Sequence, residues 1–161
     1  MNKIRKATES DIKGILNLLV QIDMIHHNAR PDIFKGPAYK YTEDELKVLL
    51  KDEKTPVFVC VDENDYVIGH AFCVCKQKID HNVLTDIKTL YIDDICVDEK
   101  MRGQHIGKSL YDYVVKFAKE NDFYNITLNV WKCNPGAIEF YKKMGLEPQR
   151  VFMEKIIKND E

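Results

Sequence analysis

The chain has 161 residues, a length that favours one domain and leaves little room for a separate regulatory module. Hydrophobic residues make up 45% and charged residues 31%, which is typical of a soluble globular protein and excludes disordered, collagen-like and coiled-coil architectures. The formal net charge of −2 offers no general attraction to nucleic acid or to an anionic membrane. We therefore expect a single domain over residues 1–161 that binds neither.

The distribution of apolar residues and cysteines predicts a cytoplasmic protein. No apolar run approaches the roughly 18 residues of a membrane helix, and the opening MNKIRKATESDIKG lacks the apolar stretch of a secretory signal. The five cysteines are odd in number and unevenly spaced, which argues against a disulfide framework. Cys73 and Cys75 share a strand-like run, but no second Cys or His pair lies at ligand spacing, so we expect buried thiols and no metal site.

The first half of the chain reads as a short strand followed by two capped helices. Residues 3–7 are strand-like, and Thr8 opens TESD, a variant capping box before a helix that continues to the His26 region. Residues 28–41 are irregular and rich in aromatics, which predicts a loop that covers a site. Thr42 then opens a full capping box, TEDE, and a short helix.

The second half alternates strands and helices. Runs at 57–61, 66–78 and about 87–97 are joined by turns and predict an antiparallel meander. A charged loop precedes a helix with an apolar face that begins at Ile106. A strand at 126–131, a helix capped by Asn134 and ended by Gly145, and a last strand at 151–157 complete the predicted order.

The strongest signal for function is the segment from Arg102 to Gly107, RGQHIG, between a predicted strand and a helix. Glycines let the backbone approach a ligand closely, and the free N–H groups of the first helical turn favour a phosphate. The phosphate motifs GxxxxGK and GxGxxG are both absent. Because any strand-to-helix turn favours glycine, a purely structural interpretation of this segment alone stays open.

Two segments together resemble the GNAT family of acetyl-CoA-dependent N-acetyltransferases. Arg102 and Gly107 match motif A of that family, whereas His105 occupies the position of its usual first glycine. The segment NPGAIEFYKKMGL, from Asn134 to Leu146, resembles motif B. The resemblance implies an α/β (α+β) GNAT fold with a mixed, mostly antiparallel central sheet of about six to seven strands and about four flanking helices.

The resemblance also implies which residues bind acetyl-CoA. Backbone N–H groups of the turn would hold the pyrophosphate, and the pantetheine would lie along the strand that ends at Val97. Tyr141 would protonate the departing thiolate, a modest assistance because a thiol has a pKa near 8.5. The expected coenzyme-binding residues are Ile95, Cys96, Val97, Arg102, Gly103, Gln104, His105, Ile106, Gly107, Lys108, Asn134 and Tyr141.

The acceptor side is predicted from acidic residues in the run LYIDDICV. Strand alternation sends Asp93 and Asp94 to opposite faces unless a bulge intervenes, so one of them should face the cleft; an internal salt bridge is the alternative. The segment is similar to diamine acetyltransferases, which implies that Asp93 acts as the base. We expect His26, Asp93 and Asp94 to bind substrate, although a histidine at a helix C-terminus also suits the helix dipole. His70 is expected to pack or to hydrogen-bond.

These observations predict an enzyme that transfers an acetyl group from acetyl-CoA to a primary amine by direct attack in a ternary complex, without a metal. The acceptor would be a small-molecule or peptide amine, and the acidic pair favours a cationic one. A homodimer is common among relatives of this size. The alternative is a non-catalytic sensor or regulatory module that binds acyl-CoA.

Overall fold

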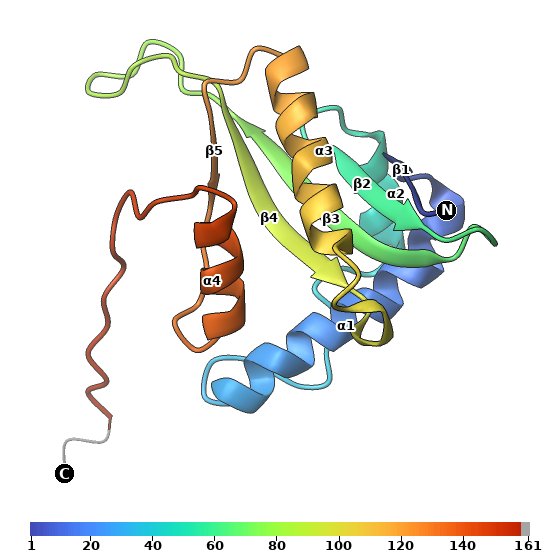
Figure 1. Cartoon of the computed structure of the whole chain (residues 1–161). Coiled ribbons are helices and arrows are strands. Elements are labelled where there is room, and N and C mark those ends of the chain that lie inside the picture. The colour runs from blue at the N-terminus through green and yellow to red at the C-terminus, as the bar shows by residue number, and fades with distance from the viewer. Residues whose placement is uncertain (159–161) are drawn as a thin grey trace.

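The computed structural model describes residues 1–158 and contains a five-stranded sheet in the order β1-β2-β3-β4-β5 (Figure 1). Neighbours from β1 to β4 are antiparallel, which confirms the meander, and β4 and β5 are parallel. The fold class is confirmed. The strands are β1 (Lys3–Lys6), β2 (Val57–Val61), β3 (Val67–Lys76), β4 (Thr89–Val97) and β5 (Asn125–Leu128).

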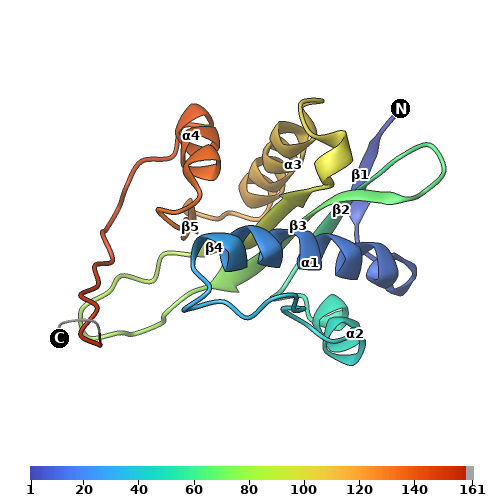
Figure 2. The ribbon, with the colours of Figure 1, turned by 90° about the horizontal axis from the view of Figure 1, so that it is seen from below.

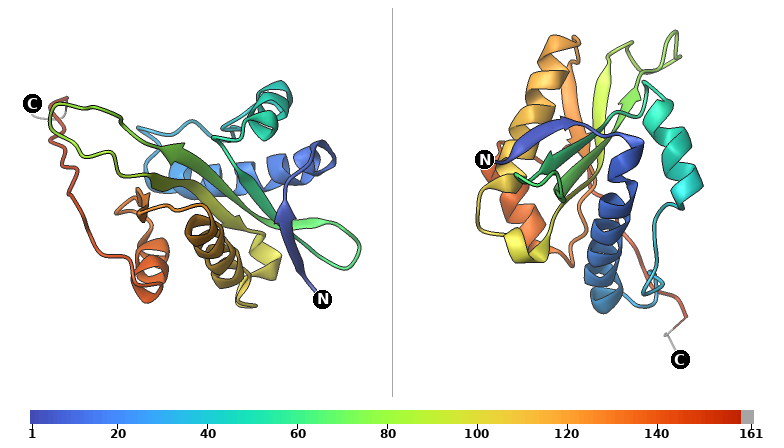
Figure 3. Two further views of the ribbon diagram at one scale, coloured as in Figure 1. Left: turned by 90° about the horizontal axis from the view of Figure 1, so that it is seen from above. Right: turned by 90° about the vertical axis from the view of Figure 1, so that its right-hand side faces the viewer.

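Helices cover both faces of this sheet, as Figure 3 shows. Helices α1 (Ile12–Ala29) and α2 (Glu43–Lys51) lie on one face, and α3 (Ile106–Glu120) and α4 (Pro135–Lys143) lie on the other. Strand side chains alternate between these layers. Phe72 packs with the α1 and α2 core, and its neighbours Ala71 and Cys73 pack with the α3 core. Within residues 1–158, no helix is long and apolar enough to cross a bilayer.

The predicted helix caps are present. Thr42 N donates to Glu45 Oε2 at 2.7 Å and Glu45 N donates to Thr42 Oγ1 at 3.2 Å, which closes the capping box of α2. Asn134 Oδ1 accepts from Ala137 N at 3.3 Å at the start of α4. Local hydrogen bonds therefore fix where these helices begin.

Two expectations about the sheet are wrong. The strand predicted at 151–157 is absent, because these residues pair with no strand in the described chain, and the sheet has five strands rather than six or seven. The strand predicted at 126–131 ends earlier, at Leu128. Apolar β-prone composition favours an extended backbone, but a strand also needs a partner for its N–H and C=O groups.

A buried carboxylate joins β1 to the start of α1. Asp11 is 3% exposed, and its carboxylate accepts hydrogen bonds from Arg5 Nη1 at 2.7 Å, Arg5 Nη2 at 3.0 Å and Thr8 N at 2.7 Å. Burial alone would raise the pKa of Asp11, but the bonds from Arg5 and Thr8 outweigh it and lower that pKa. The native state therefore favours the charged carboxylate.

We expect Asp11→Asn to lower the free energy of unfolding by about 2–3 kcal/mol at pH 7, because it breaks a largely buried ion pair. Because folding lowers the pKa of Asp11, the ion pair stabilises the folded state fully above pH 3.8, the ordinary pKa of an aspartate. This stabilisation is lost as the pH falls through the lower pKa that Asp11 has in the folded protein. Urea unfolding across pH should therefore show the parent and variant converging in acid. Asp65→Asn, which removes an exposed partner of Arg5, is the control and should cost under about 0.5 kcal/mol.

Candidate active site

Strands β4 and β5 separate halfway along β4, which leaves one edge of β4 open (Figure 1). Their pairing runs from Thr89 with Asn125 to Ile92 with Leu128 and then stops, while β4 continues to Val97. This continuation contains the residues predicted to bind the pantetheine, Ile95, Cys96 and Val97. They pair with β3 on their other side. An extended ligand can therefore hydrogen-bond to the open edge as an added strand would.

The turn after β4 presents free N–H groups at the start of α3. Gly103 has φ of 79° and His105, the residue before the helix, has φ of 59°. Both are left-handed, a conformation that His adopts more readily than β-branched residues do. The His105 side chain makes no capping bond, so the amides of the first turn point outward with the helix dipole behind them. The turn also exposes three polar side chains, those of Arg102, Gln104 and Lys108. Two of them are cationic, so the predicted residues fit an anionic ligand.

Gly107 marks the place where α3, α4 and the end of β4 meet. A Cβ at Gly107 would lie 3.5 Å from the Phe140 ring and 3.7 Å from a methyl group of Val97, which is ordinary contact distance. A methyl group therefore fits, but a larger side chain would extend into the space between these elements. Asn134 lies at the start of α4, where its side chain is used as the helix cap.

A β-bulge at Asp93 brings both acidic side chains to one side of the sheet. Phe72 pairs with Asp94 and Cys73 pairs with Ile92, so Asp93 is the extra residue. Asp93 Oδ2 accepts from Lys40 Nζ at 2.7 Å and from Tyr41 Oη at 3.0 Å. These partners precede α2, on the face that Phe72 shares with α1 and α2.

Asp94 is held by a buried histidine on the neighbouring strand. His70 Nε2 lies 2.8 Å from Asp94 Oδ2, and His70 is fully buried with no hydrogen-bond partner for Nδ1 among the described residues. The single bond therefore assigns the ring proton to Nε2, which donates to the carboxylate. His70 packs and hydrogen-bonds, as predicted. The Asp94 side chain is 12% exposed, so part of it stays accessible.

Tyr141 and Cys96 both remain protonated at neutral pH. Burial, with a further contribution from the charge of Asp94, raises the pKa of Tyr141 well above its usual value of 10.0. Burial likewise raises the pKa of Cys96 to about 12, and its Sγ donates to Leu18 O at 3.6 Å. Tyr141 can therefore donate a proton, whereas Cys96 is a poor nucleophile.

Three rings from distant segments form a wall near the acidic pair. Phe34 stacks on His26 with centroids 4.9 Å apart and meets Trp131 edge-on, also at 4.9 Å. Burial lowers the pKa of His26, and nearby Asp94 works against this shift. The wall joins the end of α1, the 28–41 loop and the segment after β5. The sequence predicts His26 on the acceptor side, but no local pattern indicates that Lys40 and Tyr41 bind Asp93.

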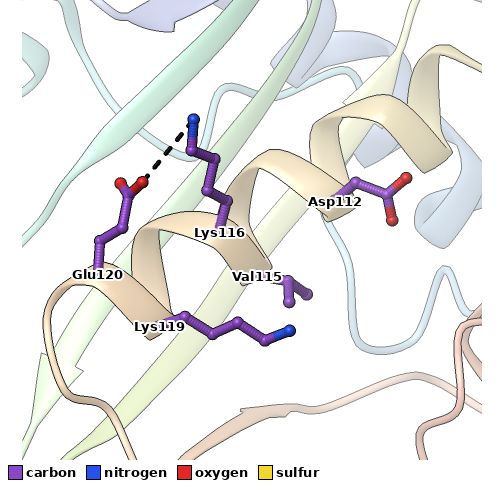
Figure 4. Close-up of a pocket in the computed structure, with 5 residues that line it drawn as sticks. All are labelled: Asp112, Val115, Lys116, Lys119 and Glu120. Atoms are coloured by element: carbon purple, nitrogen blue, oxygen red, sulfur yellow. Dashed lines mark ion pairs between the residues drawn. The ribbon is translucent and has the colours of Figure 1, made fainter.

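The hollow along α3 that Figure 4 shows is separate from this arrangement. Lys116 pairs with Glu120 there at 3.7 Å. The hollow is lined by one helix, beyond the turn that starts at Gly103, and it brings together no groups from different elements. Among residues 1–158, no cluster of three or more His, Cys, Asp or Glu side chains is arranged to hold a metal ion.

Free amides at a helix start beside an open strand edge suit an extended ligand with an anionic head. Comparison with known families makes this specific: residues 22–146 match the acetyltransferase (GNAT) family model. The chain belongs to the GNAT family, whose members use acetyl-CoA as a co-substrate.

Individual relatives agree with this assignment. The uncharacterized N-acetyltransferase MJ1207 of Methanocaldococcus jannaschii is 28% identical over 154 residues, covering 92% of this chain and 62% of the relative. The peptidyl-lysine N-acetyltransferase YjaB of Salmonella typhimurium is 29% identical over 105 residues, covering 64% of this chain and 59% of the relative. The chain therefore spans about three fifths of the length of these curated relatives.

A solved structure extends the agreement to nearly the whole fold. The crystal structure of a mutant BH1408 protein from Bacillus halodurans superposes with a TM-score of 0.92 at 29% identity. It covers 96% of this chain and 99% of that one.

Gly107→Val should weaken acetyl-CoA binding by tenfold or more, because its branched side chain fills the space between α3, α4 and Val97. Isothermal titration calorimetry measures the dissociation constant. Gly107→Ala is the matched control: alanine suits a helix better than glycine by about 1 kcal/mol, so stability should hold or rise while affinity changes less. Unchanged affinity in the valine variant would place the coenzyme elsewhere.

Proposed function

We propose that this chain is an N-acetyltransferase that moves the acetyl group of acetyl-CoA to a primary amine by direct attack in a ternary complex. The observation that carries the proposal is the open edge of β4, with free amides at its end and two carboxylates at its bulge. The first two features suit a coenzyme, and the third suits an amine. The free state of all five cysteines suits a reducing cytoplasm.

The coenzyme would bind through the chain's backbone more than through its side chains. Amides from Gln104 to Lys108 would hold the pyrophosphate, supported by Arg102. The open edge at Ile95, Cys96 and Val97 would bind the pantetheine, and an N–H there would polarise the thioester carbonyl. The bound coenzyme supplies the activated acetyl group.

The acceptor would enter between the bulge and the aromatic wall. Asp93 and Asp94 favour a cationic amine, and His26, Phe34 and Trp131 give its carbon skeleton an apolar surface. A relative named as a peptidyl-lysine N-acetyltransferase supports a primary amine as the acceptor class. Small-molecule and peptide amines both meet this description.

Two protons must move during transfer. A cationic amine first releases one proton to the solvent, which gives the nitrogen a lone pair for attack. The neutral nitrogen then forms its bond to the acetyl carbon as the carbon–sulfur bond breaks, and the nitrogen loses a second proton. Asp93 would take that proton, through water, and Tyr141 would give its hydroxyl proton to the departing sulfur. The raised pKa of Tyr141 supports this role, because the hydroxyl stays protonated until the carbon–sulfur bond breaks.

The direct test is a thermal-shift measurement with acetyl-CoA, followed by thiol detection across a panel of amines. The enzyme should be stabilised by acetyl-CoA and should release thiol with at least one cationic primary amine. Stabilisation with no thiol release across chemically broad amines would instead support the coenzyme sensor.

Tyr141→Phe should lower kcat by about 10- to 100-fold, at the low end of general-acid effects because a thiolate leaves readily. The dissociation constant for acetyl-CoA should change little, because the ring remains in place. Steady-state kinetics and calorimetry on the same preparation separate the two. An unaltered kcat would remove Tyr141 as the acid.

Asp93→Asn and Asp94→Asn form a matched pair that separates the adjacent carboxylates. If Asp93 is the base, Asp93→Asn should lower kcat/KM by about 10²-fold or more and remove the acidic limb of its pH profile. Asp94→Asn should mainly raise KM and should leave the acidic limb of the pH–rate profile in place. The pH–rate profiles of both variants decide the assignment, and loss of the limb in Asp94→Asn alone would transfer the role to Asp94.

A further inference from the structure

The 28–41 loop places a lysine of this chain on one of the two carboxylates at the bulge. Lys40 Nζ donates to Asp93 Oδ2 at 2.7 Å, and the two side chains are 45% and 22% exposed. An ammonium group bonded to Asp93 is the arrangement that a cationic acceptor would itself form there. Lys40 therefore occupies, from within the chain, a position that the cation of an acceptor could otherwise take.

Contacts on both sides of Lys40 hold it in this position. Figure 2 shows the loop leaving the end of α1 and running back beside that helix to α2. Ala38 N donates to Asp23 Oδ2 at 3.0 Å, which ties the loop to α1. On the other side, the Tyr41 hydroxyl donates to Asp93 Oδ2 at 3.0 Å. The backbone at Lys40 lies between two anchored residues, so the fold itself directs its ammonium group to the carboxylate.

Asp94 differs from Asp93 because its partner brings no charge. His70 Nε2 donates to Asp94 Oδ2 at 2.8 Å, while His70 Nδ1 is buried without a hydrogen-bond partner among residues 1–158. A second ring proton would have no acceptor there, so the ring is neutral. The hydrogen bond orients Asp94 and leaves its negative charge in place. One carboxylate of the bulge is thus offset by a cation, and the other keeps its charge for a ligand.

The charge of Lys40 also reaches the aromatic wall on which the acceptor would lie. Burial lowers the pKa of His26. The charges of Asp94 and Asp23 oppose this shift, whereas that of Lys40 adds to it. A second cation placed between the wall and the bulge would be repelled by Lys40 and would find Asp93 already paired.

We propose that Lys40 determines the charge of the acceptor: it pairs with Asp93 from within the chain, leaves Asp94 for a single ammonium group, and selects monoamines over diamines. The inference rests on the proposed function and narrows its substrate class. Selectivity here comes from a repulsive element, the Lys40 cation, as well as from an attractive one. Removing the Lys40 charge would free a second carboxylate and move the preference toward diamines.

The test measures the binding of two amines with the same carbon chain, pentylamine and cadaverine, which differ by one ammonium group. Calorimetry on the protein saturated with coenzyme A gives both dissociation constants without acetyl transfer. The parent should bind pentylamine at least as tightly as cadaverine. Lys40→Met keeps the length of the side chain and removes its charge, so the ratio of the two constants should shift toward cadaverine by about five- to tenfold.

Three further variants separate the charge from other effects of the substitution. Lys40→Arg keeps a cation that can pair with Asp93, so it should retain the parent's ratio. Lys35→Met removes an exposed lysine of the same loop and should also retain it. Adding Asp93→Asn to Lys40→Met removes the freed carboxylate as well, so the ratio should return to the parent's value.

A parent that prefers cadaverine, or a ratio that is unchanged in Lys40→Met, overturns the proposal. A ratio that stays shifted in the double variant does so too, since the freed carboxylate would not be its cause. Lys40→Met binding neither amine is equally contrary, because two open carboxylates should hold the diamine. Thiol release across the amine panel is measured separately. Transfer without the shift therefore removes only the role of Lys40, and the shift without transfer to any amine removes only the proposed function.

Discussion

The extra residue at Asp93 is the constraint on which the site depends. In a regular strand, Asp93 and Asp94 would face opposite sides of the sheet. The bulge shifts the alternation by one, so both carboxylates are bound by groups on the α1 and α2 side, while Ile92 and Ile95 keep their contacts with the α3 core. Pairing with β5 also ends at Ile92, so the bulge adjoins the start of the open edge.

Phe72 supports the partners of both carboxylates. It is 2% exposed and pairs with Asp94 across the sheet. The Tyr41 ring stacks on it with centroids 5.5 Å apart, and the His70 ring meets it edge-on at 4.9 Å. Tyr41 binds Asp93 and His70 binds Asp94, so one buried ring fixes the groups that orient both acids. Such packing is what makes a polar site rigid in a low-dielectric setting.

The features that sequence predicts well are those encoded by neighbouring residues. The caps at Thr42 and Asn134 depend on contacts within a few positions. The sequence does not show whether β4 contains a bulge, because two adjacent aspartates are compatible with a regular strand and with a bulged one. The bond from Tyr41 to Asp93 spans 52 positions and depends on how the 28–41 loop packs, for which no local pattern exists.

The missing sixth strand has the same kind of explanation, and it bears on the site. Local composition at 151–157 predicts an extended backbone, but pairing depends on which edge is available. Strand β5 pairs with β4 over four residues, which is short for a stable strand. Trp131, which follows this short strand, has its ring against Phe34 of the 28–41 loop. A contact between segments that lie far apart in the sequence, and not the sheet alone, therefore holds the aromatic wall together.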